Sequence, residues 1–447
     1  MYIIIRDVLL KVHILRARSL CSSTFLIIML VAGFIIPFQY YYSAYGEVSK
    51  VQSKNGPIIK DSHLKVDLVS KGLKKPTSMA FLGPNDILVL EKDKGTVRRV
   101  VNGRILSEPL LDVNVANKNE RGMLGIAIAR NVTKHVIYVF LYFTETKTKD
   151  GTDECPGFAH CKPGHEPLGN RLYRYELVNN SKLVNPKLLL DLPATPGPAH
   201  NGGAIIISPD NNIYIPIGDV RGSTNPQAEE SLDGRGGILR ITQDSKPAGK
   251  AILGNKYPLN RYYAYGIRNS FGIDFDPVTK KLWDTENADH YGDEINLVYP
   301  GFNSGHNEIH GFSFLDNKFN PNNLLTFGGK GKYSDPEFVW ATTVGPTAIK
   351  FLNSDKLGKQ YKNDMFVGDF HGGNIYHFKL NKHRTGLMLN SSSVLADKIA
   401  NTPQETQDIL FGEGFGGITD IEVGPDGYMY VVSISDGAIY RIVPKSE

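Results

Sequence analysis

One histidine stands at a position suited to acid–base chemistry. His200 follows a proline-rich turn and precedes a glycine pair and an apolar run in "AHNGGAIIISPDNNIYIPIGD", which ends at Asp219. An imidazole titrates near neutral pH, so it can accept a proton from a substrate hydroxyl. The small residues Gly202 and Gly203 would let a ligand approach the backbone. The alternative is that His200 is an ordinary turn residue whose ring binds a carbonyl.

Two later loops carry groups that bind anions and cations. "YAYGIRNSFGIDFDP" contains Arg268 and Asn269, and a guanidinium fork binds carboxylates in bidentate fashion. "DTENADHYGDEINLVYPGFNSGHN" is rich in the carboxylate and carbonyl oxygens that Ca²⁺ prefers. The alternatives are a surface turn for the first loop and a solvated acidic loop for the second.

Internal repetition indicates the scaffold that positions these loops. A turn, a β-rich run, a few polar residues and a second β-rich run recur six times, with Val, Ile, Tyr and Phe in the runs and Gly, Asn or Asp in the turns. Six such meanders in one chain predict an all-β, six-bladed β-propeller, in which loops converge near the axis at one rim. The repeats begin near "LGPNDILVLEKDKGTVRRV", "HVIYVFLYFTE", "ISPDNNIYIPIGD", "FDPVTKKLWDTEN", "KNDMFVGDFHGGNIYHFKL" and "GPDGYMYVVSISDGAIYRIV".

The first 63 residues differ in composition from the rest. Arg16 and Arg18 precede an apolar run from Phe25 to Phe38, which is shorter than the roughly 20 residues that a spanning helix needs. We therefore expect a signal-peptide core or a transmembrane anchor, with the remaining chain outside the cytoplasm, secreted or membrane-anchored. The expected divisions are a basic segment (1–24), the signal or anchor (25–45), a linker (46–63) and the propeller (64–447).

Charge and motif content exclude two classes of function. The net charge is only +4 and the basic residues are spread along the chain, so nucleic acid is not an expected partner. Neither a G-x-S-x-G nor an H-E-x-x-H stretch is present, which disfavours a hydrolase. Cys155 and Cys161 share one short loop, where a local disulfide is the simplest interpretation and a metal site with His160 and His165 is the alternative.

The order of the motifs resembles a known family. "HNGG", "GIRN", "TEN" and "GDEINLVYPGFNSG", followed by "FVGDFHGGNIYHFKL" and "DIEVGPDGYMYVVS", are similar to the soluble quinoprotein glucose and aldose sugar dehydrogenases, the glucose/sorbosone dehydrogenase family. The likeness runs from about Leu64 to Pro444. It implies a six-bladed propeller, in agreement with the repeats, with pyrroloquinoline quinone (PQQ) and Ca²⁺ bound on top.

The resemblance also assigns roles to residues. His200 matches the base that removes the proton from the anomeric hydroxyl of a sugar while a hydride passes to the quinone. Arg268 and Asn269 match the pair that contacts the quinone, with Arg268 stabilising the anionic oxygen. Further cofactor-binding positions are Glu120, Asp219 and His371.

Two calcium sites follow from the same resemblance. The backbone carbonyls of Ala288 and Asp289 match those that hold the cofactor-bound ion, although the family usually has Gly-Pro there. Glu294, with a carbonyl near Ser304, resembles a structural calcium site.

Several positions depart from the family pattern. His371 replaces a lysine, Gly417 and Thr419 replace two arginines, and Ala199 replaces an aspartate. Each lost charge-assisted bond removes about 1.5–3 kcal/mol from the binding of an anionic cofactor. Two functions therefore stay open. One is a dehydrogenase that oxidises aldose sugars to lactones and passes electrons to an external acceptor; the other is a non-catalytic propeller that binds a carbohydrate or protein partner. An uncleaved N-terminal segment would add the membrane as a partner.

Overall fold

The protein is built from β-strands joined by turns. The computed structural model describes residues 56–149, 164–221 and 224–445; the predicted signal or anchor segment and the cysteine loop lie outside them. In the described part, no helix is long and apolar enough to cross a bilayer. The helical elements there are short 3₁₀ turns: η2 (Glu229–Ser231), η3 (Leu259–Arg261), η4 (Ser313–Leu315), η5 (Pro321–Asn323), η6 (Lys359–Tyr361) and η7 (Glu405–Asp408).

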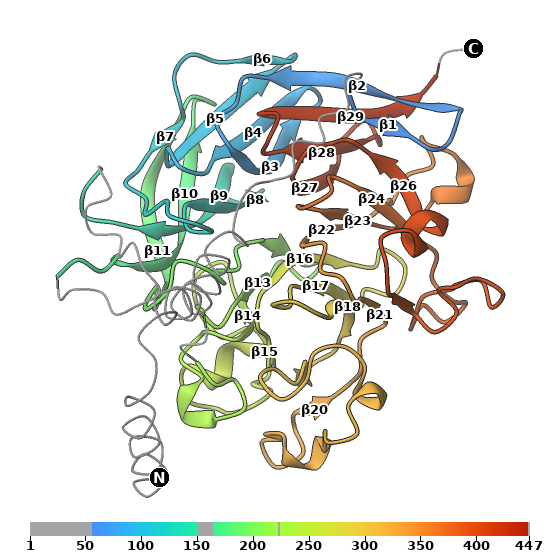
Figure 1. The fold of residues 1–447 in the computed structure, drawn as a ribbon. Helices are drawn as coiled ribbons and strands as arrows, with labels where there is room; N and C mark the ends of the chain where they lie inside the picture. The colour runs from blue at the N-terminus through green and yellow to red at the C-terminus, as the bar shows by residue number, and fades with distance from the viewer. Residues whose placement is uncertain (1–55, 150–163, 222–223, 446–447) are drawn as a thin grey trace, which may run out of the picture. The chain divides into compact units, whose positions relative to one another are not determined.

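The strands of the first half of the chain form three sheets (Figure 1). The first sheet contains β3 (Pro76–Gly83), β4 (Asp86–Glu91), β5 (Thr96–Val101), β6 (Arg104–Ile105) and β7 (Leu111–Asp112). The second contains β8 (Met123–Asn131), β9 (Val136–Glu145), β10 (Gly169–Val178) and β11 (Lys182–Leu192). The third contains β12 (Ile206–Ile207), β13 (Ile213–Ile217), β14 (Gly237–Ile241), β15 (Tyr262–Tyr265), β19 (Phe302–Asn303) and β20 (Lys332–Tyr333).

Three more sheets follow in the second half. The fourth contains β16 (Ser270–Phe275), β17 (Leu282–Glu286), β18 (Asp293–Val298), β21 (Phe338–Trp340) and β25 (Ile399–Ala400). The fifth contains β22 (Pro346–Phe351), β23 (Met365–Asp369), β24 (Ile375–Phe378), β26 (Leu410–Glu413) and β1 (Ile58–Ile59). The sixth contains β27 (Ile418–Val423), β28 (Met429–Ser433), β29 (Ala438–Pro444) and β2 (Leu64–Lys71). Each of the six sequence repeats lies in a different sheet.

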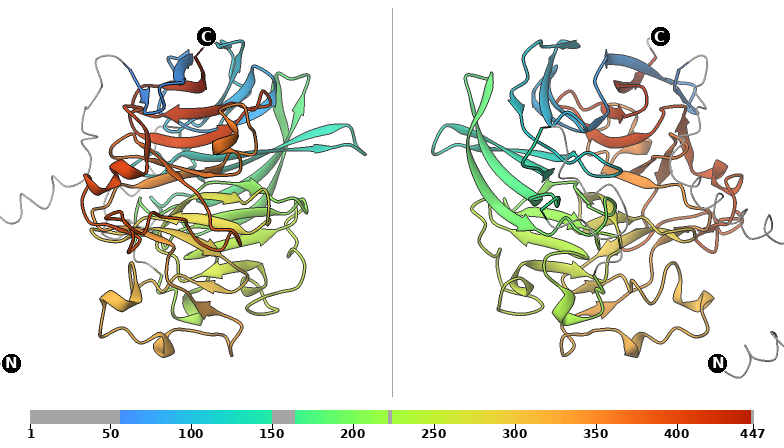
Figure 2. Two further views of the ribbon diagram at one scale, coloured as in Figure 1. Left: turned by 90° about the vertical axis from the view of Figure 1, so that its right-hand side faces the viewer. Right: turned by 60° about the vertical axis from the view of Figure 1, so that its left-hand side comes forward.

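The sheets are arranged as an all-β propeller, which confirms that part of the sequence prediction. The inner strands form a closed ring: β3 contacts β8, β8 contacts β12, β16 contacts β22, β22 contacts β27 and β27 contacts β3. Between the third and fourth sheets the contact to β16 is made by β13, the neighbour of β12. The ring closes through antiparallel pairing of β2 with β29, where Leu64 is the partner of Pro444 and Lys71 that of Ala438. Figure 2 shows the sheets from two further sides, with the segment between β19 and β21 extending from the edge of the ring. A strand near the start of the described chain, β2, and its last strand, β29, are thus held in one sheet.

Local sequence explains the strands and their turns. β9 reads VIYVFLYFTE, and its middle residues are buried because adjacent sheets cover both faces of the strand. Such β-branched and aromatic runs favour extended backbone. Asn85, Asn102 and Asn211 occupy turns between strands with φ of 55°, 49° and 62°. Asparagine tolerates this left-handed region better than most residues, so these turns reverse the chain at low cost.

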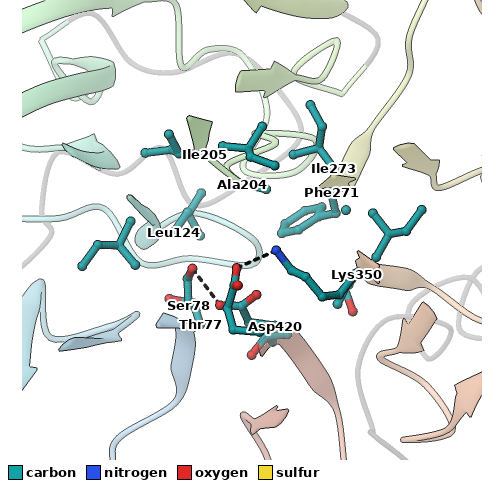
Figure 3. Close-up of a pocket in the computed structure, with 17 residues that line it drawn as sticks. Thr77, Ser78, Leu124, Ala204, Ile205, Phe271, Ile273, Lys350 and Asp420 are labelled. Carbon is teal, nitrogen blue, oxygen red and sulfur yellow. Dashed lines mark hydrogen bonds and ion pairs between the residues drawn. The ribbon is translucent and has the colours of Figure 1, made fainter. Parts of the chain in front are cut away.

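A small pocket, called the central pocket below, lies between the inner strands (Figure 3). It has a volume of about 70 Å³, with apolar side chains of the second to fourth sheets on one side and polar ones on the other. On the polar side, Nζ of Lys350 lies 3.0 Å from Oε1 of Glu422 and 3.6 Å from Oδ1 of Asp274. Asp420 accepts a hydrogen bond of 3.1 Å from Ser78. One lysine therefore links carboxylates from the fourth and sixth sheets.

Candidate active site

His200 and Asp219 form a buried pair within the third sheet. Nδ1 of His200 lies 2.6 Å from Oδ1 of Asp219, and the two residues are only 5% and 1% exposed. His200 precedes β12 and Asp219 follows β13, so one hairpin of the sheet holds both residues. An ionised Asp219 accepts the Nδ1 proton, which leaves Nε2 of His200 as the basic nitrogen of the ring.

The backbone around His200 is held in an uncommon conformation. His200 has a φ of 59°, and its N–H donates a hydrogen bond of 2.7 Å to Oε2 of Glu120. A non-glycine residue in this region costs of order 1–3 kcal/mol and persists only where neighbouring contacts enforce it. Gly218 is one such neighbour, since a Cβ there would lie 2.4 Å from the carbonyl oxygen of His200 and 2.8 Å from that of Arg268. The absence of a side chain at Gly218 lets these two segments meet.

Two further histidines, His306 and His310, extend the line of side-chain contacts from Asp219. Oδ2 of Asp219 lies 3.1 Å from Nε2 of His306, and Nδ1 of His306 lies 3.2 Å from Nε2 of His310. Burial disfavours ionisation of Asp219, but the hydrogen bonds of His200 and His306 outweigh it and lower its pKa. Burial lowers the pKa of His310 to about 4, and the neighbouring His306 acts in the same direction. Asp219 is thus a carboxylate between two imidazoles, followed by a neutral His310.

The "GIRN" loop lies directly against this pair. The N–H of Asp219 donates to the carbonyl of Arg268 at 2.8 Å. The guanidinium of Arg268 donates to the carbonyl of Asn287 at 2.7 Å and lies 3.4 Å from Oδ1 of Asp289. Asn269 donates to Glu120 at 3.3 Å, and its own Oδ1 is buried without a hydrogen-bond partner. The structure therefore brings together His200, Asp219, Arg268, Asn269 and Glu120, five of the sequence-predicted site residues.

Three buried carboxyl groups lie behind Arg268. Asp284 and Glu286 are two residues apart on β17, and Glu286 is the register partner of Glu294 on β18. Burial and the charge of Glu286 raise the pKa of Asp284 to about 8, and burial also raises those of Glu286 and Glu294. Neither carboxylate oxygen of Asp284 has a hydrogen-bond partner, whereas Glu286 accepts the N–H of Arg268 at 2.6 Å. A proton or a cation would stabilise this cluster.

The first pair of residues expected to bind calcium makes other contacts. The N–H of Ala288 donates to Oδ1 of Asp293 at 2.8 Å. The side chain of Asp289 is exposed and faces Arg268 and His290. The candidate calcium ligands at this position are therefore the backbone carbonyls of Ala288 and Asp289, as the resemblance implied.

Glu294 and Ser304, the second pair of residues expected to bind calcium, do lie together. Oγ of Ser304 is 3.5 Å from Oε2 of Glu294 and donates at 2.5 Å to Oε2 of Glu286. The other oxygen of Glu294 accepts the N–H of Gly311 at 2.7 Å. Throughout residues 56–149, 164–221 and 224–445, no group of three or more His, Cys, Asp or Glu side chains is arranged to hold a metal ion.

Two of the positions that depart from the family pattern, His371 and Thr419, make their contacts outside the cluster around His200. His371 is exposed, and its Nδ1 lies 3.3 Å from the carbonyl oxygen of Thr343. Thr419 donates to the carbonyl of Pro76 at 3.0 Å and lines the central pocket. The structure therefore does not join His371 to the cluster around His200.

The reason proposed for the glycine pair was wrong. A Cβ on Gly202 would lie 2.2 Å from the carbonyl oxygen of Pro216, and one on Gly203 would lie 2.7 Å from Cβ of Leu124. The chain itself fills the space at both glycines. They are needed for packing between strands rather than for the approach of a ligand.

Sequence reasoning missed the roles of Glu286, His306 and His310. Glu286 was visible as the acidic residue of "TEN", two residues after Asp284 on the same strand, which puts both side chains on one face. His306 and His310 follow "FNSG" at a spacing of four residues, with no strand or helix to fix their direction. Only the fold of the loop after β19 reveals their contact with Asp219.

A β-propeller with a buried His–Asp pair beside an Arg–Asn pair agrees with one family in particular. The chain belongs to the glucose/sorbosone dehydrogenase family, because the family model "Glucose / Sorbosone dehydrogenase" matches residues 73–441.

Two relatives with named activities are similar to this chain in sequence. The chain is 24% identical over 389 residues to "Aldose sugar dehydrogenase YliI" of Escherichia coli (strain K12), covering 85% of this chain and 93% of the relative. It is 25% identical over 272 residues to "Quinoprotein glucose dehydrogenase B" of Acinetobacter calcoaceticus, covering 55% of this chain and 52% of the relative.

Solved structures share the fold. The PQQ-bound form of aldose sugar dehydrogenase from Streptomyces coelicolor matches with a TM-score of 0.61 and 24% identity, covering 86% of this chain and 98% of that one. The apo-form of the soluble aldose sugar dehydrogenase from Escherichia coli matches with a TM-score of 0.64 and 21% identity, covering 86% and 100%.

Proposed function

We propose that the protein is a quinone-dependent dehydrogenase that oxidises the anomeric carbon of an aldose sugar to a lactone. The observation that carries the proposal is the 2.6 Å contact between His200 and Asp219, held beside Arg268. A base at this position, an anion-binding group and a hydride acceptor are what the reaction requires. The family membership and the PQQ-bound neighbour support PQQ as that acceptor.

The residues present fit an anionic quinone. Arg268 offers a guanidinium that binds carboxylates and stabilises negative charge on a quinone oxygen. Asn269 has a buried Oδ1 without a partner, so one hydrogen-bonding position of this amide is open to a ligand. Glu120 binds both the Asn269 amide and the His200 N–H and thereby fixes the distance between base and amide. Arg268 and Asn269 would hold the cofactor.

The reaction then divides between the chain and the cofactor. When bound, PQQ supplies the acceptor for the hydride that leaves C1 of the sugar. Nε2 of His200 would take the proton of the C1 hydroxyl as the C1–O bond becomes a carbonyl. The sugar then loses two electrons and two protons in all, both electrons and one proton as the hydride and the second proton to His200. Asp219 stabilises the resulting imidazolium and keeps Nδ1 protonated. An external acceptor must later remove the electrons.

Calcium is part of the proposal at two positions. The carbonyls of Ala288 and Asp289 would bind an ion shared with the cofactor, and Glu294 with a carbonyl near Ser304 would bind a structural ion. The crowding of Glu294 against Glu286 supports the second, because a cation would offset their repulsion. Chelation should lower the melting temperature of the wild type, and Glu294→Gln should lessen that response. An equal response in both proteins would contradict the structural site.

The finer features of the architecture and location are also proposals. Each of the six sheets would be one blade, with four antiparallel strands as its core. The N-terminal segment would export the propeller and leave it secreted or anchored outside the cytoplasm, where an external electron acceptor is available.

A cofactor titration tests the proposed function. Purified protein should take up PQQ in the presence of Ca²⁺, with a saturable change in quinone absorbance. Arg268→Met should weaken uptake by about tenfold or more, since a charge-assisted hydrogen bond contributes about 1.5–3 kcal/mol. Failure of the wild type to bind PQQ would contradict the proposal and favour a propeller without this chemistry.

A further inference from the structure

Two histidines beside the candidate active site present ring nitrogens to each other. Nδ1 of His306 lies 3.2 Å from Nε2 of His310, and the two ring centroids are 5.0 Å apart. Both residues follow β19, in a turn where the N–H groups of Glu308 and Ile309 donate to the carbonyl of Gly305. Two histidines four residues apart are the spacing at which a pair of imidazoles on one side of a helical turn binds Zn²⁺.

The distances between the two rings fit one metal ion held by both. When an ion lies about 2.1 Å from each nitrogen, on the axis of each ring, a ligand angle of about 100° puts the nitrogens about 3.2 Å and the ring centroids about 5 Å apart. A straight N–H···N hydrogen bond of the same length would separate the centroids by about 5.5 Å. The distances in the structure therefore agree better with two ligands that converge on one point.

The second nitrogen of His306 has the partner that metal-bound histidines usually have. Its Nε2 lies 3.1 Å from Oδ2 of Asp219. A ligating histidine almost always donates its other N–H to a carboxylate or a carbonyl, which fixes the ring and makes the ligating nitrogen more basic. Since an ionised Asp219 only accepts hydrogen bonds, His306 donates from Nε2, and its Nδ1 carries the lone pair. The nitrogen that faces His310 is therefore free to bind a metal.

The charges around His310 favour a cation between the rings. A metal ion binds neutral imidazole, and the low pKa of His310, caused first by burial, keeps this ring neutral. Two carboxylates, those of Asp219 and Asp289, and one guanidinium, that of Arg268, act on the ring electrostatically. Two negative charges and one positive charge sum to one negative charge, which attracts a divalent ion.

The site also has room for the water that a metal ion with few protein ligands requires. His310 lines a pocket of about 500 Å³, whose walls come from the loop between β17 and β18 and from the segment after β19. This segment extends from the ring in Figures 1 and 2. Glu308 and Asp316 line the same pocket and are exposed, so further negative charge lies near the ion.

We propose that His306 and His310 together bind one divalent transition-metal ion. Imidazole nitrogen suits Zn²⁺, Cu²⁺ and Ni²⁺, whereas Ca²⁺ and Mg²⁺ take oxygen ligands, so this site differs in chemistry from the calcium positions described above. Among the described residues no third histidine, cysteine or carboxylate is arranged to join the pair, so water completes the coordination. The ion lies one residue from Asp219 and outside the roles given to PQQ and calcium.

Zinc binding by untagged, cofactor-free protein tests the site. Equilibrium dialysis followed by metal analysis gives the number of ions per chain. His306→Gln and His310→Gln each remove one imidazole, and glutamine keeps an amide that can donate a hydrogen bond in place of the ring. His63→Gln is the matched control, because the side chain of His63 is 91% exposed elsewhere on the protein.

The wild type should bind one more Zn²⁺ than either His306→Gln or His310→Gln, or bind it at least about tenfold more tightly. His63→Gln should bind as many ions as the wild type, and excess Ca²⁺ should not displace the zinc. Equal zinc binding by the wild type and both pocket variants, or displacement of the zinc by Ca²⁺, would overturn the inference.

Copper identifies the ligands directly. With one equivalent of Cu²⁺, the electron paramagnetic resonance spectrum of the wild type should show coupling to two imidazole nitrogens, and that of His310→Gln to one fewer. The same spectrum in both proteins would contradict the site. Neither measurement needs PQQ or turnover, so the metal site stands or fails independently of the proposed function.

Discussion

Oδ1 of Asp219 lies 2.6 Å from Nδ1 of His200, in a site where both side chains are buried. This contact determines which nitrogen of the imidazole is basic, because the carboxylate holds the proton on Nδ1. The other oxygen of Asp219 is occupied by His306 at 3.1 Å, so the carboxylate is fixed at both ends. The orientation of the proposed base therefore depends on one aspartate.

Replacing that aspartate should abolish most of the activity without unfolding the protein. Asp219→Asn keeps the shape of the side chain but loses the charge that stabilises an imidazolium, so kcat should fall by at least ~10²-fold. Steady-state kinetics with a sugar substrate measure this. Asp210→Asn, in the turn before β13, is a control that should keep kcat near the wild-type value. Similar kcat values for the two variants would contradict the role of Asp219.

Gly218 should be intolerant of even one added carbon. In Gly218→Ala the new Cβ would meet the carbonyl oxygens of His200 and Arg268 at 2.4 Å and 2.8 Å. Overpacking of this kind costs about 1–3 kcal/mol in the free energy of unfolding. Denaturant titration should detect that loss, together with lower activity. Gly83→Ala, where nothing lies within 4 Å of the new Cβ, should change stability by less than about 1 kcal/mol; equal losses would show that the contacts at Gly218 relax freely.

Binding of PQQ should depend on the guanidinium group of Arg268 and not only on its positive charge. Arg268→Lys keeps the positive charge but loses the planar fork that donates to Asn287 and that we propose to hold the quinone. The dissociation constant for PQQ should rise by about tenfold, corresponding to one charge-assisted hydrogen bond. Arg240→Lys on the third sheet is the control and should bind PQQ as the wild type does. Unchanged affinity in Arg268→Lys would mean that this guanidinium does not hold the cofactor.

The buried carboxyl group of Glu422 in the central pocket should make the stability of the protein depend on pH. Burial raises the pKa of Glu422 from 4.5 to about 7, although the charge of Lys350 opposes the shift (Figure 3). Between pH 4.5 and 7 the folded state therefore retains a proton that the unfolded state releases, so this group makes stability fall as pH rises through that window. Below the window both states are protonated and the contribution is constant.

Glu422→Gln removes this titration and tests its sign. The melting temperature of the variant, minus that of the wild type, should increase from pH 4.5 to pH 7. Glu108→Gln, at an exposed position, should give a difference that does not change with pH. A constant difference for Glu422→Gln would contradict the raised pKa.

Much of the fold was predictable because its units are local. A turn followed by two β-rich runs is a short-range pattern, and each of the six repeats found in the sequence lies in its own sheet. The closure of the ring was harder to predict from the sequence. Pairing of Leu64 with Pro444 joins residues from opposite ends of the chain, and no local pattern specifies such a contact.

The candidate site was predictable where a short motif carries the functional group. Arg268 and Asn269 stand in "GIRN", and the structure places them against Asp219 and Glu120. His306 was not predictable, because its contact with Asp219 depends on how a loop lacking regular structure folds.

The most direct test of the account is sugar oxidation by the PQQ-loaded protein with and without its proposed base. Wild-type protein and His200→Ala, both folded by circular dichroism and both loaded with PQQ and Ca²⁺, are assayed with glucose and an artificial electron acceptor. The account predicts turnover by the wild type and a loss of at least ~10²-fold in kcat for His200→Ala, the low end for removal of a general base. Equal turnover by the two proteins, or none by a wild type that binds PQQ, would contradict it.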